Sequence, residues 1–312
     1  MKVRNNIPVY KISWLRYADG GTIGTYYEPE NREELLNLCK HLYKEGKTFD
    51  IIGHTSNIYF LPSYSVDILV STRKVKETTE EDKYIIADCG VSVSSLARQM
   101  VIKGIKGFEG LIDLPGTVAA SVYGNASCYG CSINSLLESF QLLTPDGEIK
   151  TLHTGDLKLS KRSTSFKRNE LGGVILAVKL RKKPGNAEQL RLLAEQCHER
   201  RKATQPPAND NLGSIYSNKH ELTPIGFVIK GIAKIIATLY GLTGQSRNKI
   251  KKKQQEIMLI LSGGKELIPY VYSWNRYIWK DERSHELFWK FHHIHKKLFK
   301  ESNFEIEIKG KI

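Results

Sequence analysis

The chain has 312 residues, which is enough for two or three domains that each bury a core of their own. With 40% hydrophobic and 26% charged residues, its composition is typical of a soluble globular protein. The net charge of +14 suits an anionic partner. The sequence has no basic region before heptads and no zinc-knuckle spacing, so we expect no nucleic-acid binding, whereas a phosphate-bearing substrate would fit the charge.

The cysteines and the apolar segments predict a cytoplasmic protein. No secretory apolar region follows Met1, and five scattered cysteines in a chain of this size favour a reducing compartment. The longest apolar stretch, residues 225–242, is interrupted by Lys230 and Lys234, so we expect no membrane insertion. The oligomeric state stays open.

The predicted elements mix helices with short strands. Asn31, followed three residues later by Glu34, is a capping-box pattern that predicts the start of a helix. Helical spacing of apolar residues predicts helices over residues 31–42, 94–103, 187–201 and 285–300. Apolar runs between turn residues predict strands at 49–52, 67–71, 84–88, 139–144, 148–152, 173–181 and 304–308. Because strands and helices do not alternate regularly, the predicted fold class is α+β.

Two loops of small residues could approach a ligand closely. The first is the turn 53–57, where hydroxyl groups and successive backbone N–H groups could meet phosphate oxygens. The second covers residues 115–121, where all side chains are small. The chain has no G-x-G-x-x-G after a strand and no G-x-x-x-x-G-K-[ST], so a nucleotide cofactor would bind by a different scheme. Taken singly, each loop could equally be an ordinary tight turn.

Six segments of the chain carry the signatures of one enzyme family in the family's order. They are GHTSNIYF at 53–60, GFEGLIDLPGTV at 107–118, NASCYG at 125–130, SKRSTSFK at 160–167, GSIYSN at 213–218 and FEIEIK at 304–309. They resemble the UDP-N-acetylenolpyruvoylglucosamine reductases, flavoenzymes of peptidoglycan precursor synthesis with a PCMH-type FAD-binding fold similar to vanillyl-alcohol oxidase. The match is dense from residue 49 to residue 180 and is reduced to islands after that.

The resemblance implies a two-subdomain PCMH-type FAD-binding domain followed by a smaller, divergent α+β substrate domain. The expected boundaries are 1–71 and 72–185 for the two FAD-binding subdomains and 186–312 for the substrate domain. The implied cofactor is non-covalent FAD, with NADPH as hydride donor and a nucleotide sugar as substrate. The implied cofactor-binding residues are Gly53, His54, Thr55, Ser56, Asn57, Pro115, Gly116, Thr117, Ser121, Asn125, Tyr129 and Gly130.

Three reacting positions are carried over by the resemblance. Arg162 stands where the family arginine polarises the substrate carboxylate, Ser214 where the serine gives a proton to the enol intermediate, and Glu307 where a glutamate assists. These roles suit the addition of a hydride to an enolpyruvyl double bond, which leaves negative charge beside a carboxylate. We expect no metal site, because Cys128 and Cys131 lack a second pair and the histidines of residues 285–295 fit a solvated helix face.

The last third of the chain departs from the family pattern. The family's Val-Ser-x-x-His-x-x-Phe-hydrophobic-Asn stretch, which belongs to the nucleotide-sugar domain, is missing, and residues 270–280 stand in its place. Three hypotheses therefore stay open. The chain reduces a UDP-linked enolpyruvyl sugar, it reduces a different nucleotide sugar in surface-polysaccharide synthesis, or it is a non-enzymatic descendant on a flavin fold. The sequence also does not decide whether NADPH or NADH is the hydride donor.

Overall fold

The computed structural model describes residues 1–11, 18, 20–160, 163–207, 210–217 and 220–311. They form two compact units: unit 1 is Met1–Thr204 with Ile308–Ile312, and unit 2 is Gln205–Glu307. The predicted boundary after residue 185 lies before helix α5 (Ala187–Thr204), which the structure groups with unit 1. Leu190 and Ala194 of that helix are buried in the core of unit 1, which explains the grouping.

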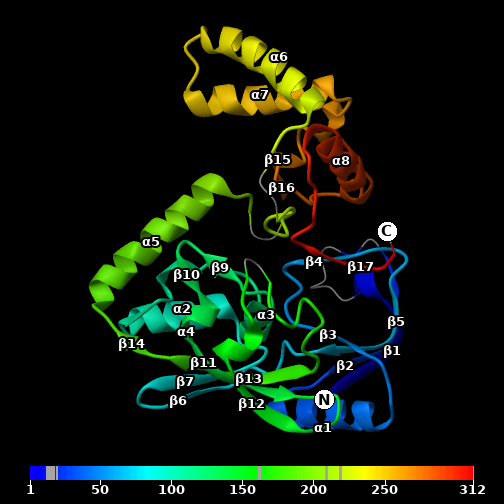
Figure 1. The fold of residues 1–312 in the computed structure, drawn as a ribbon, viewed down its shortest axis with the longest axis vertical. Coiled ribbons are helices and arrows are strands. Elements are labelled where there is room, and N and C mark those ends of the chain that lie inside the picture. The colour runs from blue at the N-terminus through cyan, green and yellow to red at the C-terminus, as the bar shows by residue number, and fades with distance from the viewer. Residues whose placement is uncertain (12–17, 19, 161–162, 208–209, 218–219, 312) are drawn as a thin grey trace. The chain divides into compact units, whose positions relative to one another are not determined.

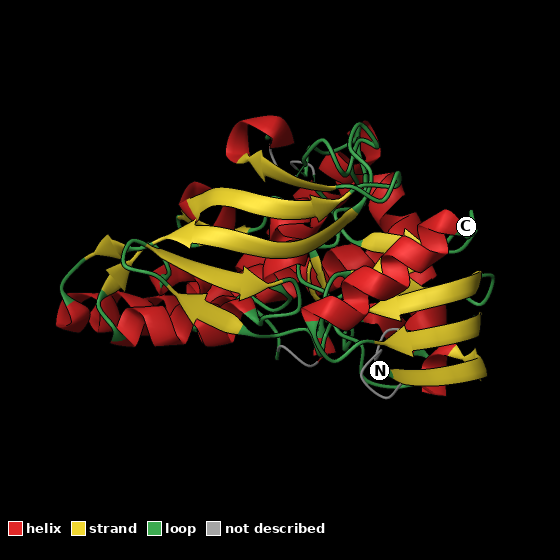
Figure 2. Cartoon of the chain, turned by 90° about the horizontal axis from the view of Figure 1, so that it is seen from below, coloured by secondary structure: helices red, strands yellow, loops and turns green. Residues whose placement is uncertain are grey.

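Unit 1 contains two main sheets, which Figure 2 shows as separate groups of yellow strands. The first has the order β1 (Lys2–Pro8), β2 (Thr22–Glu28), β5 (Ser65–Ser71), β3 (Asp50–Ile52). Its β2–β5 and β3–β5 pairs are parallel and β1–β2 is antiparallel. Helix α1 (Arg32–Lys44) follows β2 in the chain (Figure 1). Its Leu35 and Leu38 share a buried cluster with Val70 of this sheet.

The second sheet is antiparallel and five-stranded. Its order is β12 (Ile149–His153), β11 (Leu137–Leu143), β13 (Val174–Arg181), β7 (Tyr84–Asp88), β6 (Thr78–Glu80). Helices α2 (Val93–Ile102) and α3 (Val118–Tyr123) share its core, which includes Leu96, Val122 and Phe140. The shorter elements are η1 (Val9–Lys11), β4 (Ile58–Phe60), β8 (Ile105–Lys106), η2 (Glu109–Leu111), β9 (Ser127–Cys128), β10 (Cys131–Ser132), α4 (Ile133–Leu136), η3 (Thr154–Leu157) and β14 (Lys183–Pro184).

Most of the predicted elements of unit 1 are present within a few residues. Asn31 caps α1, since its side chain accepts a hydrogen bond from the Glu34 backbone N–H at 2.9 Å. The Glu34 carboxylate accepts from the backbone N–H of Glu30, also at 2.9 Å, so the reciprocal bond reaches one residue beyond the cap. The predicted hairpin forms β11 and β12. Strands β1 and β2 were not predicted.

Unit 2 is built on helices around an aromatic core. Its elements are α6 (Pro224–Gly241), α7 (Arg247–Leu261), η5 (Lys265–Leu267), β15 (Val271–Ser273), β16 (Arg276–Tyr277) and α8 (Ser284–Leu298). Tyr216, Tyr277, Phe288 and Phe291 are almost wholly buried in it. The final strand, β17 (Glu307–Lys309), is shorter than predicted. Its Lys309 already belongs to unit 1, where its carbonyl accepts from the Leu61 backbone N–H.

The prediction of a solvated histidine face on the last helix is wrong. His295 has no exposed surface, and its ring stacks on that of Tyr216 with centroids 3.8 Å apart. One ring nitrogen lies 2.6 Å from the Ser302 hydroxyl and the other 3.1 Å from His220 Nδ1. Burial lowers the pKa of His295 to about 3, so the ring is neutral at physiological pH.

Candidate active site

The first predicted ligand loop is a tight turn directly after β3. Thr55 adopts a φ of +51° and is almost fully buried, and the Ile58 backbone N–H closes the turn on the Thr55 carbonyl at 3.1 Å. A positive φ is rare for a β-branched residue and marks a conformation that the surrounding structure must stabilise. The turn therefore holds residues 53–57 in one fixed conformation at the end of the strand.

The second predicted loop leads into α3 and is tied to α2. Gly116 has a φ of +114°, which a residue with a side chain rarely adopts. Thr117 is the N-cap of α3, where its hydroxyl accepts from the Ala120 backbone N–H at 3.3 Å. The Gly116 carbonyl accepts from the Val93 backbone N–H at 3.1 Å, which fixes the loop against the start of α2.

The two loops touch each other. A Cβ atom added to Gly53 would lie 2.8 Å from Thr117 Oγ1 and 3.0 Å from Thr117 Cγ2, closer than carbon atoms normally approach. A Cβ atom on Gly116 would lie 3.3 Å from Ser56 Oγ. Segments that are far apart in the sequence thus form one continuous cradle of backbone and small side chains.

The remaining predicted cofactor residues follow α3. Asn125 and Tyr129 have φ values of +47° and +45°. The Asn125 side chain donates to the Ser160 carbonyl at 2.7 Å and accepts from Asn134 at 3.1 Å. The Tyr129 hydroxyl is buried and has no hydrogen-bond partner among the described residues. A buried hydroxyl without a partner is costly, so a ligand atom that bonds to it would stabilise the site. Ser121 is buried within α3 itself.

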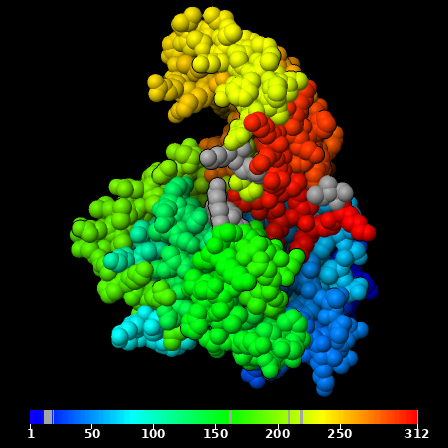
Figure 3. All heavy atoms as spheres, viewed as in Figure 1, coloured from blue at the N-terminus to red at the C-terminus, as the bar shows by residue number. Residues whose placement is uncertain are grey.

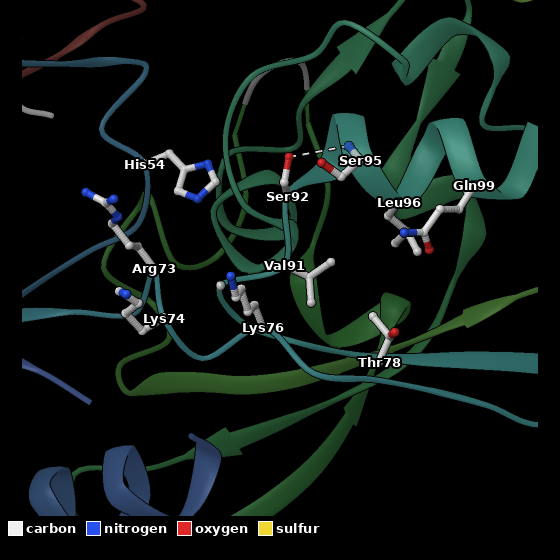
Figure 4. A pocket seen from close by; sticks show the side chains of 11 residues that line it. His54, Arg73, Lys74, Lys76, Thr78, Val91, Ser92, Ser95, Leu96 and Gln99 are labelled. Atoms are coloured by element: carbon white, nitrogen blue, oxygen red, sulfur yellow. Dashed lines mark hydrogen bonds between the residues drawn. The ribbon is translucent and has the colours of Figure 1, made fainter. Parts of the chain in front are cut away.

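A cavity of about 390 Å³ in unit 1 begins at His54 of the first loop (Figure 4). Its lining includes the cations Arg73, Lys74 and Lys76, and Ser92, which is the N-cap of α2. Burial, and secondarily the charge of Arg73, lower the pKa of His54, so that its ring is neutral at pH 7. A cavity with three cations and a helix N-terminus favours an anionic ligand such as a diphosphate.

These three cations were missed in the sequence, although a local signal was available. Arg73, Lys74 and Lys76 fall within four residues directly after the predicted strand 67–71. The lining of the cavity and the unpartnered Tyr129 hydroxyl together fit FAD, whose diphosphate carries two negative charges and whose rings and ribose offer hydrogen-bonding groups.

Ser214 and Glu307 both lie in unit 2. The Ser214 hydroxyl is half-buried and accepts a hydrogen bond from Arg276 Nη1 at 3.5 Å. Tyr216 pairs with Phe304 in an antiparallel bridge, and the Glu305 backbone N–H donates to the Ile215 carbonyl at 2.8 Å. In this register the position opposite Ser214 is Ile306, the residue before Glu307. Arg162, the third predicted reacting residue, lies outside the described residues.

The segment in place of the missing family motif supports Ser214. Asn275 accepts from the Tyr216 backbone N–H at 2.6 Å and donates to the Tyr216 carbonyl at 3.0 Å, which fixes the segment that carries Ser214. The next residue is Arg276, whose guanidinium reaches the Ser214 hydroxyl. A cation beside a half-buried hydroxyl suits a site that binds an anion and transfers a proton. Sequence reasoning did not assign a role to Arg276.

The comparisons with known proteins agree with this site. Residues 24–153 match the model of an FAD binding domain. The UDP-N-acetylenolpyruvoylglucosamine reductase of Streptococcus suis (strain 05ZYH33) is 26% identical over 197 residues, 63% of this chain and 65% of that enzyme. The enzyme of that name from Streptococcus pneumoniae (strain JJA) is 28% identical over 214 residues, 69% of this chain and 70% of its own length. The chain thus spans slightly less than two thirds of the first of these relatives.

A solved structure extends the similarity of fold over almost the whole chain. The crystal structure of UDP-N-acetylenolpyruvylglucosamine reductase from Thermus caldophilus has a TM-score of 0.64 at 17% identity and covers 99% of both chains. The α+β fold class and the PCMH-type FAD-binding domain that the sequence predicted are confirmed, and with them FAD as the cofactor.

Proposed function

We propose that this chain, a divergent relative of the UDP-N-acetylenolpyruvoylglucosamine reductases, uses FAD and NADPH to reduce the enolpyruvyl group of a UDP-linked sugar. The observation that carries the proposal is the cradle in which Gly53 and Thr117 touch, beside a cavity lined by three cations. We place the reaction in the cytoplasm. In support, no disulfide joins any of the described cysteines.

The residues of this chain would hold the cofactor and handle the proton. The loops at Gly53 and Gly116 would accept the diphosphate, with Arg73 as a counter-charge. Bound FAD would supply a hydride to one carbon of the enolpyruvyl double bond. The Ser214 hydroxyl would then give a proton to the other carbon, so that one hydride and one proton saturate the bond.

Arg276 would assist the proton transfer through its positive charge. Its guanidinium donates to the Ser214 oxygen, and a positive charge there would stabilise the serine oxygen as the proton leaves. Arg162 and Glu307 enter the proposal through the family resemblance alone, Arg162 as the group that stabilises charge on the substrate carboxylate and Glu307 as the assisting acid.

An anaerobic half-reaction experiment tests the proposal. The purified yellow protein is first bleached with NADPH, with NADH in a parallel cuvette, and then mixed with UDP-N-acetylenolpyruvoylglucosamine. We expect bleaching by NADPH and a return of the flavin absorbance in proportion to the enolpyruvyl sugar added. A bleached flavin that the sugar does not reoxidise would contradict the proposal, and a colourless protein without flavin would favour a non-enzymatic descendant.

A second nucleotide sugar is the alternative, and one observation favours it. In the last third of the chain the family's nucleotide-sugar motif is absent, and the segment with Asn275 and Arg276 supports Ser214 instead. The same reduced protein, mixed with a panel of nucleotide sugars that carry an unsaturated substituent, separates the two hypotheses by which compound restores the absorbance.

A further inference from the structure

Helix α6 presents a long apolar stripe to solvent. Ile225, Val228, Ile232, Ile235, Ile236 and Leu239 recur at spacings that place them on one side of the helix. All six are exposed, Val228 and Ile235 at more than 60% of their surface. A stripe of this spacing normally faces a protein core, so its exposure marks a surface that meets another apolar phase.

A neighbouring side of the helix is already occupied. Gly226, Ile229, Ala233 and Ala237 form the buried side of α6. The Gln254 side chain of α7 donates to the Lys230 carbonyl at 3.5 Å, and a Cβ atom on Gly226 would lie 2.2 Å from the Leu298 carbonyl of α8. These contacts prevent α6 from rotating about its own axis, so the stripe cannot become buried within unit 2.

The helical hairpin of α6 and α7 is strongly basic, and its one acidic side chain, Glu256, pairs with Lys253 at 3.3 Å. Residues 223–255 contain seven basic side chains and no acidic one: Lys230, Lys234, Arg247, Lys249, Lys251, Lys252 and Lys253. Six of them are exposed, and only Lys253 is half-buried. Figure 3 shows the hairpin in yellow, projecting beyond the orange and red atoms of the same unit. Apolar stripe and cations thus share one projecting element.

The positive charge of the hairpin decides which partner covers the apolar stripe: a second copy of the chain or a lipid bilayer. A second copy of the hairpin would bring seven further cations against these seven, which opposes self-association. By length and composition α6 could cross a membrane. Lys230 and Lys234 in its middle, and the sides of α6 that pack on α7 and α8, instead favour a helix that lies along the surface.

We propose that the α6–α7 hairpin docks the protein on an anionic lipid bilayer, with the stripe of α6 in the interfacial region and the basic residues of α7 at the lipid phosphates. Apolar burial and attraction to anionic headgroups are the two terms that bind interfacial helices. Neither contribution depends on which sugar is reduced. Docking would therefore place the enzyme at the membrane without changing its reaction.

Co-sedimentation of the purified full chain with preformed vesicles tests the proposal. We expect binding to vesicles of phosphatidylcholine mixed with phosphatidylglycerol, much weaker binding to phosphatidylcholine alone, and release by high salt. The variant I235Q/L239Q should lose roughly ten-fold or more in partition coefficient for each side chain. Its matched control is L192Q/L193Q, two exposed leucines on α5, which should bind as the parent does.

A second pair of variants tests the electrostatic contribution to vesicle binding. K251Q/K252Q on α7 should lose about five-fold per lysine on anionic vesicles, whereas K296Q/K297Q on α8 should lose much less. Equal losses in both lysine pairs would overturn the proposal, because non-specific attraction by the total charge would then suffice. So would an absence of vesicle binding, or a dimer that I235Q/L239Q dissociates, or a bound protein that resists carbonate extraction as a spanning helix does. Circular dichroism of each variant confirms that it is folded.

Discussion

Replacing Gly53 with alanine should weaken FAD binding through a single steric contact. The added Cβ would lie 2.8 Å from Thr117 Oγ1 and 3.0 Å from Thr117 Cγ2, so one of the two loops has to move. Gly53 does not have a positive φ, so alanine fits its backbone conformation. Any loss of FAD affinity in Gly53→Ala therefore reports the contact with Thr117 and not backbone strain. Overpacking of this kind costs roughly 1–3 kcal/mol, which corresponds to a rise of about 5- to 150-fold in the dissociation constant for FAD.

Fluorescence titration of the apoprotein with FAD measures this change. The matched control is Gly155→Ala, because a Cβ atom there meets nothing within 4 Å and the residue also lacks a positive φ. Adding Thr117→Ser to Gly53→Ala removes the Cγ2 contact, keeps the capping hydroxyl and should recover part of the loss. If Gly53→Ala binds FAD as tightly as Gly155→Ala does, the two loops do not form the cofactor cradle and the reasoning fails.

Three further predictions concern unit 2. Ser214→Ala should slow the sugar-dependent reoxidation of the flavin by about 10²–10⁴-fold and leave bleaching by NADPH unchanged, as stopped-flow absorbance would measure; equal slowing of both half-reactions would argue against a proton donor. Arg276→Gln should slow the sugar-dependent reoxidation of the flavin roughly ten-fold or more, whereas Arg276→Lys should restore part of the rate; a rate that neither substitution changes would remove Arg276 from the site. The pKa of buried His295 is about 3, against about 6.5 in an unfolded chain. The unfolded state therefore takes up a proton that the folded state refuses, and stability falls as the pH drops below about 6.5. The loss from this group reaches about 2 kcal/mol at pH 5. Urea unfolding followed by tryptophan fluorescence at pH 7.5 and pH 5 measures it, and a pH dependence that His295→Gln leaves unchanged would contradict the assignment.

The ligand loops were predictable because their signals are local. Gly53 and Gly116 sit in short runs of small residues, and turn residues define such segments without reference to distant parts of the chain. That the two loops touch was not predictable from the loops themselves. The contact depends on how β3 and the start of α2 pack in unit 1.

Errors and omissions arose where distant residues decide the outcome. The spacing of His292 and His295 places them on one helix face, but it does not show whether that face is exposed to solvent or buried in the core. Tyr216, which stacks on His295 from a distant segment of the chain, shows that the face is buried. Arg276 was missed for the same reason, because its partner Ser214 lies 62 residues away. The apolar spacing of α6 was visible in the sequence, but its exposure depends on what α7 and α8 leave uncovered.

The return of the last strand to unit 1 has a consequence for synthesis on the ribosome. The Lys311 backbone N–H donates to the Ser63 hydroxyl at 2.8 Å across 248 residues of chain, and the Lys309 carbonyl accepts from Leu61. Domains commonly fold as they emerge, N-terminal part first. Here the edge next to Leu61 stays unpaired until residues 309–311 have been translated. Unit 1 therefore cannot complete its hydrogen bonding before unit 2 has been translated, and contacts of such high sequence separation should form late and slowly.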